Sequence, residues 1–428
     1  MKFVRPIGVT AVATASTLAL AACGGGVGGG AAGGGDSDTF TIGFVTTDTG
    51  SLADFSTPNN YVVDKMKAYF QDHPIKAGDK EFKVKIVTAD SQSDTSRAGE
   101  VAADLINNDG ADLLFADGTP TIDNPVSEQC EANSIPCLTS VSPWQPFAIR
   151  SGDKPADLKY SHHFFWGLED VAKVYSNIWK AIPNNGKAAG LFPNDADGSA
   201  WAANFPALTK DSGVTINNPG AYTDGTKDFS AQIAKFKGND VMVGLPIPPD
   251  FTTFWKQAAQ QGFKPKVATI GKAMLFPSVV ESVGKIGNNV ATEVWWHPTS
   301  AFTSSLTGQT SQALADDYES TTGKQWSQPL GFAEALFEVA TAALQKAGST
   351  DPDALNKAFD GLSVDTIVGK VSWGTDSSVP SYVAKTPVAG GQWRLNKSGS
   401  KYQFDLVVVE NSLDPETPLG GKPEALTW

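Results

Sequence analysis

The run Thr41-Ile42-Gly43-Phe44-Val45 opens the stretch that decides the fold, because its apolar and β-branched residues predict a buried β-strand. An amphipathic segment follows over residues 58–71, with apolar side chains at helical spacing. Further strands are then predicted at 82–88, 113–115 and 136–139, and further helices at 96–107 and 126–133. Strands that alternate with helices predict a parallel sheet with helices on both of its faces. This part of the chain is therefore predicted to form one doubly wound lobe.

The same alternation restarts further along the chain. It predicts helices at 169–182, 201–212 and 250–261 and strands at 188–192, 241–244 and 267–270. Helices at 306–322, 331–346 and 353–360 follow, and then strands within 368–373 and 402–409. In open parallel sheets, ligands bind outside the carboxyl ends of the strands. The sequence therefore predicts an α/β fold of two doubly wound, Rossmann-like lobes that face each other across a cleft.

The composition is that of an acidic globular protein. Of 428 residues, 41% are hydrophobic, and 46 Asp and Glu outnumber 33 Lys and Arg to give a formal charge of −13. This balance excludes nucleic acid as a partner, because phosphate binding needs a surplus of Lys and Arg. After residue 22 no run of about 18 apolar residues occurs, so the body is not predicted to span a membrane. The acidic, two-lobed architecture predicts a monomer.

The first residues have the order of a secretory signal. Lys2 and Arg5 precede an apolar stretch at 7–20 that is too short for a good spanning helix. The following Leu20-Ala21-Ala22-Cys23 resembles a bacterial lipobox, with an ordinary signal and a chance Cys as the alternative. Residues 1–22 are then a lipoprotein signal peptide, and 23–37 are the lipidated Cys23 and a flexible Gly-rich linker. This predicts an extracytoplasmic protein, anchored to the outer face of a bacterial cell membrane or in the periplasm.

Motifs for catalysis and metal binding are missing. None of the four His residues lies in a zinc-protease motif or beside a nucleophile elbow, and neither phosphate-cradling loop occurs. The segment at 193–198 fails as a calcium loop, because Pro193 and Asn204 occupy ligand positions that need carboxylates. Cys130 and Cys137 have no His nearby, which favours a disulfide over zinc. We expect no enzyme activity, no metal and no cofactor.

Four stretches, taken in order, carry a resemblance to a known family. They are Ile42-Gly43-Phe44-Val45 with Thr49-Gly50-Ser51-Leu52-Ala53, Asn107-Asn108-Asp109-Gly110-Ala111 with Phe115-Ala116-Asp117-Gly118-Thr119, 135–143, and 254–265. The chain from about residue 38 onward resembles the solute-binding proteins of ABC importers, in the class of the leucine/isoleucine/valine-binding protein. That resemblance implies a type I periplasmic-binding fold, with two lobes joined by a three-crossover hinge and a small-molecule ligand between them. ABC permease subunits are then the protein partners.

By the same resemblance, lobe 1 comprises 38–158 plus 298–366, and lobe 2 comprises 159–297 plus 367–428. Ligand contacts come from the loops after the strands of both lobes. The implied positions are Ser51, Leu52, Gly118, Thr119, Thr121, Val141, Ser142, Trp144, Asp195, Asp197, Pro248 and Lys272. Trp166 and Trp296, near the first and second crossovers, are added as flat side chains that suit a planar ligand.

The position of Lys272 departs from the family pattern. Relatives that bind amino acids commonly have Glu on this loop, where it neutralises the ammonium of the ligand. Lys272 and the aromatic residues instead predict a small planar or aromatic carboxylate-like ligand. A branched-chain amino acid or short amide is the alternative, with Asp195 or Asp197 as counter-ion. A ligand sensor without transport and a secreted hydrolase are further alternatives, and the missing motifs disfavour the hydrolase.

Overall fold

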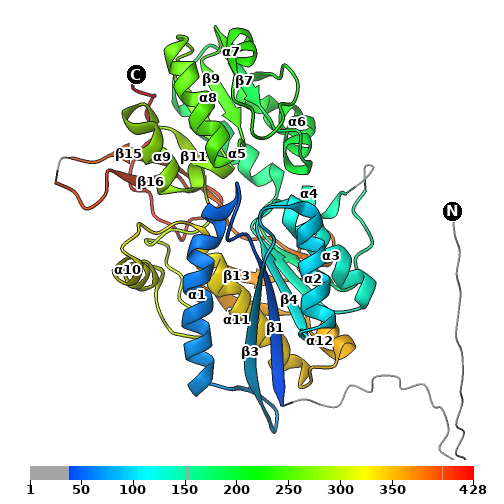
Figure 1. Cartoon of the computed structure of the whole chain (residues 1–428). Helices are drawn as coiled ribbons and strands as arrows, with labels where there is room; N and C mark the ends of the chain where they lie inside the picture. Colours follow the sequence, from blue (N-terminus) through cyan, green and yellow to red (C-terminus); the bar gives the residue numbers. More distant parts are fainter. Residues whose placement is uncertain (1–37, 151–153, 398) are drawn as a thin grey trace, which may run out of the picture. The chain divides into compact units, whose positions relative to one another are not determined.

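Two seven-stranded sheets organise the chain (Figure 1). Their strand orders are β14-β6-β5-β4-β1-β3-β2 and β16-β15-β11-β10-β9-β7-β8. The computed structural model describes residues 38–150, 154–397 and 399–428, which belong to one compact unit of the chain. The signal peptide, the lipidation of Cys23 and the linker predicted for residues 1–37 lie outside the described residues.

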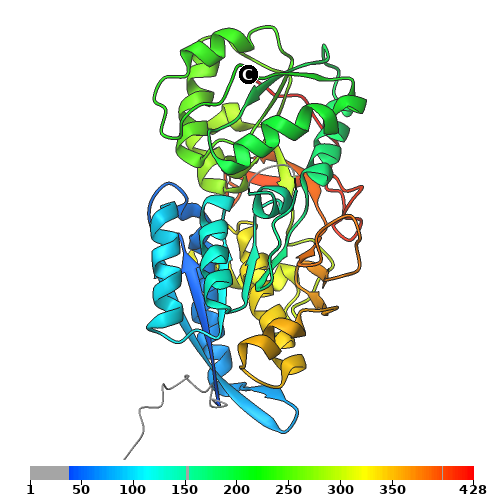
Figure 2. The same ribbon diagram turned by 90° about the vertical axis from the view of Figure 1, so that its right-hand side faces the viewer.

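The first lobe forms around the first of these sheets. Its elements begin with β1 (Thr39–Thr46), α1 (Ala53–Asp72), β2 (Ile75–Ala77), β3 (Lys80–Asp90), α2 (Thr95–Asn107), β4 (Leu113–Asp117), α3 (Pro120–Asn133), β5 (Cys137–Ser140), α4 (Trp144–Ala148) and β6 (Ser161–Phe164). β1 pairs in parallel with β3 and β4, and β5 pairs in parallel with β4 and β6. The helices α2 and α3 pack together on one face, and α1 packs with α11 on the other (Figures 1 and 2). The lobe is doubly wound, as predicted.

The second lobe repeats this plan. It contains α5 (Leu168–Ala181), β7 (Lys187–Leu191), α6 (Ala196–Leu208), η1 (Lys210–Ser212), β8 (Thr215–Asn217), α7 (Ser230–Phe236), β9 (Val241–Gly244), α8 (Pro248–Gln260), β10 (Val267–Ile270), η2 (Lys272–Leu275), α9 (Pro277–Val283), η3 (Gly284–Gly287) and β11 (Ala291–Val294). β7, β9, β10 and β11 are parallel, and β15 and β16 add an antiparallel edge. Both sheets are thus mixed and mostly parallel.

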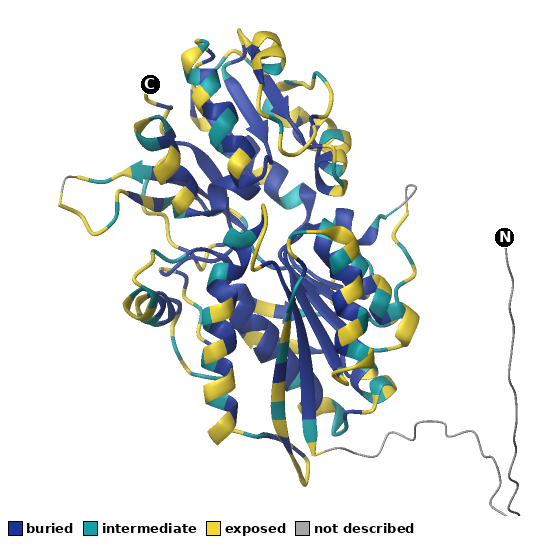
Figure 3. Ribbon diagram, in the orientation of Figure 1, coloured by how far each residue is buried: buried dark blue, intermediate teal, exposed yellow. Residues whose placement is uncertain are grey.

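The chain then returns to the first lobe before it finishes on the second. The returning elements are α10 (Ser311–Thr322), α11 (Pro329–Ala347), α12 (Pro352–Ala358), β12 (Ser363–Thr366), β13 (Gly369–Ser372) and β14 (Val383–Ala384), followed by β15 (Ala389–Leu395) and β16 (Phe404–Glu410). α11 is buried over most of its length and contacts β4 and β5. The central strands of both sheets lie in the interior, β3 and β8 are partly exposed, and the helices expose their outer faces (Figure 3).

The observed pairing moves two of the predicted lobe borders. The family intervals assign 159–164 and 367–384 to the second lobe, but β6 and β14 both pair in the first sheet. Cys137 pairs with Ser161 and Ser140 with Phe164, so the first sheet gains a strand before the chain crosses over. The crossovers therefore lie at 165–167, between β11 and α10, and at 385–388. Sequence intervals do not reveal this border, because it depends on backbone pairing between distant segments.

Several helices begin at different residues from those predicted. α1, α3 and α6 start five or more residues early, and α1 and α3 continue through internal prolines that suggest a boundary by sequence. α10 starts late, because the Thr310 hydroxyl caps it by accepting a hydrogen bond from the amide of Ala313 at 3.2 Å. Within the described parts of the chain, no helix has the length and hydropathy needed to cross a bilayer.

Candidate functional site

A small cavity lies between the two lobes, at the carboxyl ends of their strands. Its volume is about 20 Å³, little more than one water molecule requires. The lining residues are Phe55, Thr119, Val141 and Pro143 from the first lobe, Phe165, Trp166 and Trp295 from the crossovers, and Asp197, Trp201, Leu245, Lys272, Leu275 and Glu293 from the second lobe. Phe55 and Phe276 meet edge to face across the lobes, with ring centroids 4.9 Å apart. The structure is therefore a closed form, and any larger ligand needs the lobes to move apart.

Lys272 is the charged centre of the second-lobe side. Its ammonium lies 2.7 Å from Asp195 Oδ2 and 3.2 Å from Asp197 Oδ2, and its side chain is only 6% exposed. Asp195 also caps α6, because its Oδ1 accepts a hydrogen bond from the amide of Gly198 at 2.6 Å. The loop after β7 and the loop after β10 are thereby tied together. Lys272, predicted as a partner for a ligand carboxylate, already has two carboxylates of its own.

The electrostatics of this cluster follow from burial and from that pairing. Burial by itself lowers the pKa of Lys272, but Asp195 and Asp197 outweigh it and hold the pKa above its ordinary value. Burial raises and Lys272 lowers the pKa of Asp195, with a net decrease. Burial raises the pKa of Asp197 to about 6, because Lys272 compensates this second carboxylate incompletely. The cluster therefore has more negative than positive charge at neutral pH.

Glu293 adds a further carboxyl that the sequence reasoning missed. It lies on β11 within the otherwise uncharged run Ala291-Thr292-Glu293-Val294, and it is buried. The hydroxyls of Tyr175 and Thr292 both donate to its Oε2. Burial raises the pKa of Glu293 to about 7. A lone Glu in a fully buried strand is a signal that could have found this residue, since carboxyls are rarely buried without a role.

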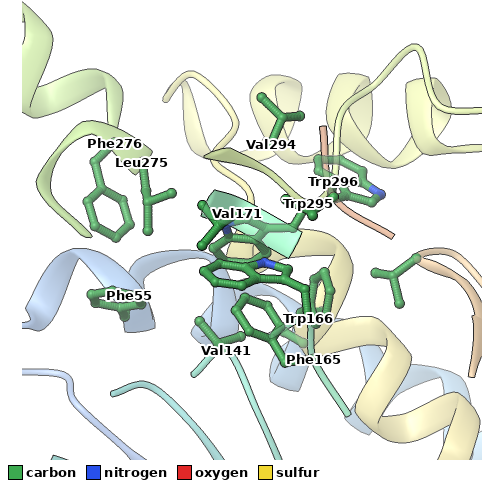
Figure 4. Close-up of a cluster of buried hydrophobic side chains, with 14 of the residues drawn as sticks. Phe55, Val141, Phe165, Trp166, Val171, Leu275, Phe276, Val294, Trp295 and Trp296 are labelled. Atoms are coloured by element: carbon green, nitrogen blue, oxygen red, sulfur yellow. The ribbon is translucent and has the colours of Figure 1, made fainter. Parts of the chain in front are cut away.

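Aromatic rings form much of the remaining wall (Figure 4). The ring centroids of Phe165 and Trp166 are 4.6 Å apart, and Phe165 meets Trp295 edge to face at 5.2 Å. Trp201 stacks on Phe205 at 4.2 Å. The indole N–H groups of Trp166, Trp201 and Trp295 are buried; those of Trp166 and Trp295 have no hydrogen-bond partner among the described residues, and that of Trp201 lies near Asp197, whose pKa it lowers. Of these three tryptophans, the sequence analysis selected only Trp166.

The first-lobe loops rest on buried carboxyl groups. Ser142 donates its hydroxyl to Asp123 at 2.7 Å, and the Asn59 amide donates to Asp117 at 2.6 Å. Burial raises the pKa of Asp123 to about 8 and the pKa of Asp117 well above its ordinary value. The hydroxyl of Ser142 is therefore used by Asp123, and Ser142 does not line the cavity.

Two lining residues have unusual backbone conformations. Val141 has φ +68° and Lys272 has φ +50°, in the left-handed region that β-branched and other large residues avoid. Such strain persists only where the surroundings enforce it, and it is concentrated at ligand sites. Val141 follows β5 directly and Lys272 follows β10 after one residue, so the strained turns direct both loops toward the cavity.

The structure brings together only some of the predicted site residues. Thr119, Val141, Trp166, Asp197 and Lys272 line the cavity, and Asp195 contacts it through Lys272. The others stand outside the lining of this closed form: Ser51, Leu52, Gly118, Thr121, Ser142, Trp144, Pro248 and Trp296.

Trp144 belongs to a polar cluster at the hinge. Its indole N–H donates to Glu169 Oε1 at 3.3 Å, and Gln145 binds both Glu169 and the amide of Leu168. Lys385, on the third crossover, lies 2.7 Å from both Glu169 and Asp170. This hinge cluster joins α4 of the first lobe to the first turn of α5 in the second.

Lys385→Met should lower the free energy of unfolding by about 2 kcal/mol, between the values for exposed and buried ion pairs. The reason is that Glu169 and Asp170 keep their half-buried positions without a counter-ion. Urea unfolding at neutral pH measures the change. Lys370→Met is the control, because Lys370 and Asp365 form an exposed pair at 3.6 Å. Equal losses in the two variants would show that the hinge cluster contributes no stability.

Trp296 packs against α11 instead of the cavity. It is 1% exposed, and Gly331 of α11 lies so close to its indole that a Cβ at this position would overlap the ring. The helix therefore needs glycine here, although alanine is the better helix former.

Gly331→Ala should cost about 1–3 kcal/mol of stability, because Trp296 has no room to move in a packed core. Gly99→Ala is the matched control on α2, where the new Cβ would meet Pro125 at an ordinary 3.6 Å. That control should be neutral or stabilising by up to about 1 kcal/mol. Thermal unfolding compares them, and a stabilising Gly331→Ala would contradict the packing argument.

The disulfide predicted between Cys130 and Cys137 is not formed in the structure. Both cysteines are buried free thiols, and burial raises the pKa of Cys130 well above its ordinary value. The buried thiols of α3 and β5 pack as small apolar groups within the core. Among the described residues, no group of three or more His, Cys, Asp and Glu is arranged to hold a metal ion.

Comparisons with known proteins identify the family. A model described as "Periplasmic binding protein" matches residues 39–392. The fold is similar to a leucine-binding protein from Thermotoga maritima, with a TM-score of 0.71, 18% identity, and coverage of 87% of this chain and 99% of that one. It is similar to a leucine-, isoleucine-, valine-, threonine- and alanine-binding protein from Brucella ovis in a closed conformation, with a TM-score of 0.72, 17% identity, and coverage of 91% and 98%.

A third similar structure is an ABC transporter solute-binding protein from Rhodopseudomonas palustris in complex with 3,4-dihydroxybenzoic acid. Its TM-score is 0.68 at 18% identity, and the match covers 89% of this chain and all of that one. At these identities the structural matches establish the fold, and the family model covers most of the described chain. This chain belongs to the periplasmic binding protein family, a family of binding proteins and not of enzymes, and it has the type I fold.

Proposed function

We propose that this chain is the extracytoplasmic solute-binding component of an ABC importer and captures a small planar or aromatic ligand between its lobes. The observation that carries the proposal is a cavity lined from both lobes in which some buried polar atoms lack protein partners among the described residues. The indole nitrogens of Trp166 and Trp295 are buried and unpaired among the described residues, whereas the Trp201 indole lies close enough to Asp197 to lower the pKa of that carboxyl. An unpaired buried polar group costs free energy, so a ligand that pairs these atoms stabilises the closed form.

Ligand capture operates by hinge closure. The three crossovers join lobes that touch across the cavity, where α4 and α6 are in contact. Opening gives the ligand access, and the ligand shifts the population back to the closed form because its contacts with both lobes exist only there. The closed pair of lobes then presents a composite surface to the permease.

The aromatic walls support a planar ligand. Similar structures include complexes with 3,4-dihydroxybenzoic acid and 4-hydroxybenzoate, which extends the comparison to aromatic ligands. A ligand carboxylate paired with Lys272, as expected from sequence, is disfavoured because Lys272 already holds Asp195 and Asp197. That same pairing favours the second candidate, a branched-chain amino acid or short amide, which brings an N–H donor for Asp197.

Lipid anchoring at Cys23 is part of the proposal. The Leu20-Ala21-Ala22-Cys23 motif supports it, together with the Gly-rich stretch that separates Cys23 from the folded unit. Cys23→Ala should move the expressed chain from the membrane fraction to the soluble fraction. Retention of that variant in the membrane fraction would overturn the anchor.

The test of the main proposal is ligand binding. The purified chain is screened by thermal shift and native mass spectrometry against amino acids, aromatic acids, amines and amides. A ligand at about a hundred times its dissociation constant should stabilise the folded chain by about 2.7 kcal/mol. A ligand that is chemically converted instead of released unchanged would overturn the assignment as a binding protein. If the chain binds a ligand but no permease or ATPase co-purifies with it, the alternative function as a ligand sensor without transport would be favoured.

A further inference from the structure

The charges around the cavity do not balance. The lining and its immediate partners contribute three carboxyls, Asp195, Asp197 and Glu293, against the single ammonium of Lys272. Asp224 lies near this cluster and adds a fourth acidic group. From the first lobe, the charge of Asp197 also raises the pKa of buried Asp123. An anionic ligand entering this site would add negative charge where negative charge is already in excess.

The hydrogen-bonding groups of the cavity limit which ligand groups can bind there. Asp197 is 4% exposed; its Oδ2 binds Lys272, and the nearby Trp201 indole lowers its pKa, but its Oδ1 has no hydrogen bond of good geometry among the described residues. A carboxylate oxygen can only accept a hydrogen bond, so its partner on the ligand must be a donor. The unpaired indole N–H groups of Trp166 and Trp295 are donors, so the same ligand must also present an acceptor. Figure 4 shows Trp166 and Trp295 in the same buried cluster as Phe165, whose ring contacts both.

The aromatic walls suit a positive charge. Trp166, Trp201, Trp295, Phe55 and Phe165 all line the cavity. Aromatic faces carry negative potential, so a cation near them is attracted by up to about 2 kcal/mol when it is desolvated. Aromatic rings and an excess of carboxyl groups around one small cavity thus favour a positively charged ligand.

We infer that the cavity selects a small planar ligand that carries a positively charged, N–H-bearing nitrogen toward Asp197 and Glu293, and that it rejects ligands of net negative charge. The inference rests on the proposed function, because it names the ligand class of the same cavity. The acceptor for the indole N–H groups is an oxygen at the other end of the ligand, such as a hydroxyl or carbonyl.

Three probes of matched size isolate the charge: 4-hydroxybenzylamine, 4-hydroxybenzamide and 4-hydroxybenzoate. They share the ring and the hydroxyl, and they differ in having a positive, a neutral or a negative group. Isothermal titration at pH 7 should give at least tenfold tighter binding of the amine than of the benzoate, with the amide between them. Benzoate binding as tight as amine binding overturns the inference and leaves the proposed function intact.

Variants of the two carboxyl residues test which of them binds the positively charged group of the ligand. Asp197→Asn should weaken amine binding at least tenfold while changing amide binding less, and Glu293→Gln should act in the same direction. Asp240→Asn is the control, since Asp240 pairs with Lys266 on the surface. If a cavity variant fails to fold, the wild-type pH profile decides, because amine affinity should rise between pH 5 and 8 as Asp197 and Glu293 ionise beside Lys272, Asp195 and Asp123. A flat profile overturns the inference, and failure of all three probes together with the wider panel overturns the proposed function as well.

Discussion

Lys272→Met is expected to lower the free energy of unfolding by about 3–5 kcal/mol at neutral pH, the usual result of removing one partner from a buried ion pair. Asp195 and Asp197 would remain buried beside an apolar side chain, at 12% and 6% side-chain exposure. The Asp195 side chain cannot rotate into solvent without giving up its cap on α6, and Asp197 lies in the first turn of the same helix. Urea unfolding followed by tryptophan fluorescence measures the loss.

The loss should depend on pH in a definite direction. In the wild type, Lys272 holds the pKa of Asp195 below its ordinary value, so this stabilisation is present above the unfolded pKa and is lost as pH falls through the folded pKa. The pKa of Asp197 is raised to about 6, so this group favours folding less as pH rises from about 4 to about 6. Without Lys272 both carboxyls retain protons to higher pH. The difference between wild type and variant should therefore shrink from pH 8 to pH 5.

Two controls separate charge from packing. Lys266→Met removes an exposed pair with Asp240, with Lys266 54% exposed, and should cost less than about 1 kcal/mol. Adding Asp195→Asn and Asp197→Asn to Lys272→Met should recover part of the loss, because the uncompensated charges are then gone. A loss that is the same at pH 5 and pH 8 would contradict the electrostatic explanation.

Trp295→Ala should cost about 3–5 kcal/mol, the range for a large aromatic removed from a packed core. Trp295 is 1% exposed, and it meets Phe165 and Phe332 edge to face at 5.2 Å and 5.0 Å. It lies immediately after β11, where the chain leaves the second lobe, and it also lines the cavity. Both the core at the crossover and the cavity wall therefore lose contacts.

Trp428→Ala is the matched control for this variant. Trp428 is 37% exposed and packs on Trp255 at the end of the chain, so its removal should cost much less. Added indole should raise the melting temperature of Trp295→Ala and leave that of the wild type unchanged, because the truncation leaves a hole of matching shape. Equal losses in both tryptophan variants would contradict the placement of Trp295 in the core.

The fold could be predicted because it depends on local patterns. Strands buried on both faces read as continuous apolar runs, and β9 and β10 occur at the residues predicted, 241–244 and 267–270. Their alternation with amphipathic helices predicts the two doubly wound lobes. Thr119, Val141, Asp197 and Lys272 lie just beyond the carboxyl ends of β4, β5, β7 and β10, so the rule that ligands bind at these ends located part of the cavity lining.

The sequence alone could not predict the partners of those residues, because the partners lie far away along the chain. Lys272 and Asp195 are 77 positions apart, and only the parallel packing of β7, β9 and β10 brings their loops together. Trp144 lies on a loop of the expected kind, but Glu169 holds its indole at the hinge. Glu293 was missed because β11 is a short strand whose polar residues hide its burial, and Trp296 was predicted at the second crossover where its neighbour Trp295 lines the cavity.

The α/β class, the two lobes and the loops that approach the cleft follow from hydrophobic periodicity, which is read locally along the chain. The tertiary structure decided which side chains are already paired, where the chain crosses between lobes, and therefore the net charge of the cavity. The physical reason is that a buried charge depends on every group within a few ångströms, and those groups come from loops and strands far apart in the sequence.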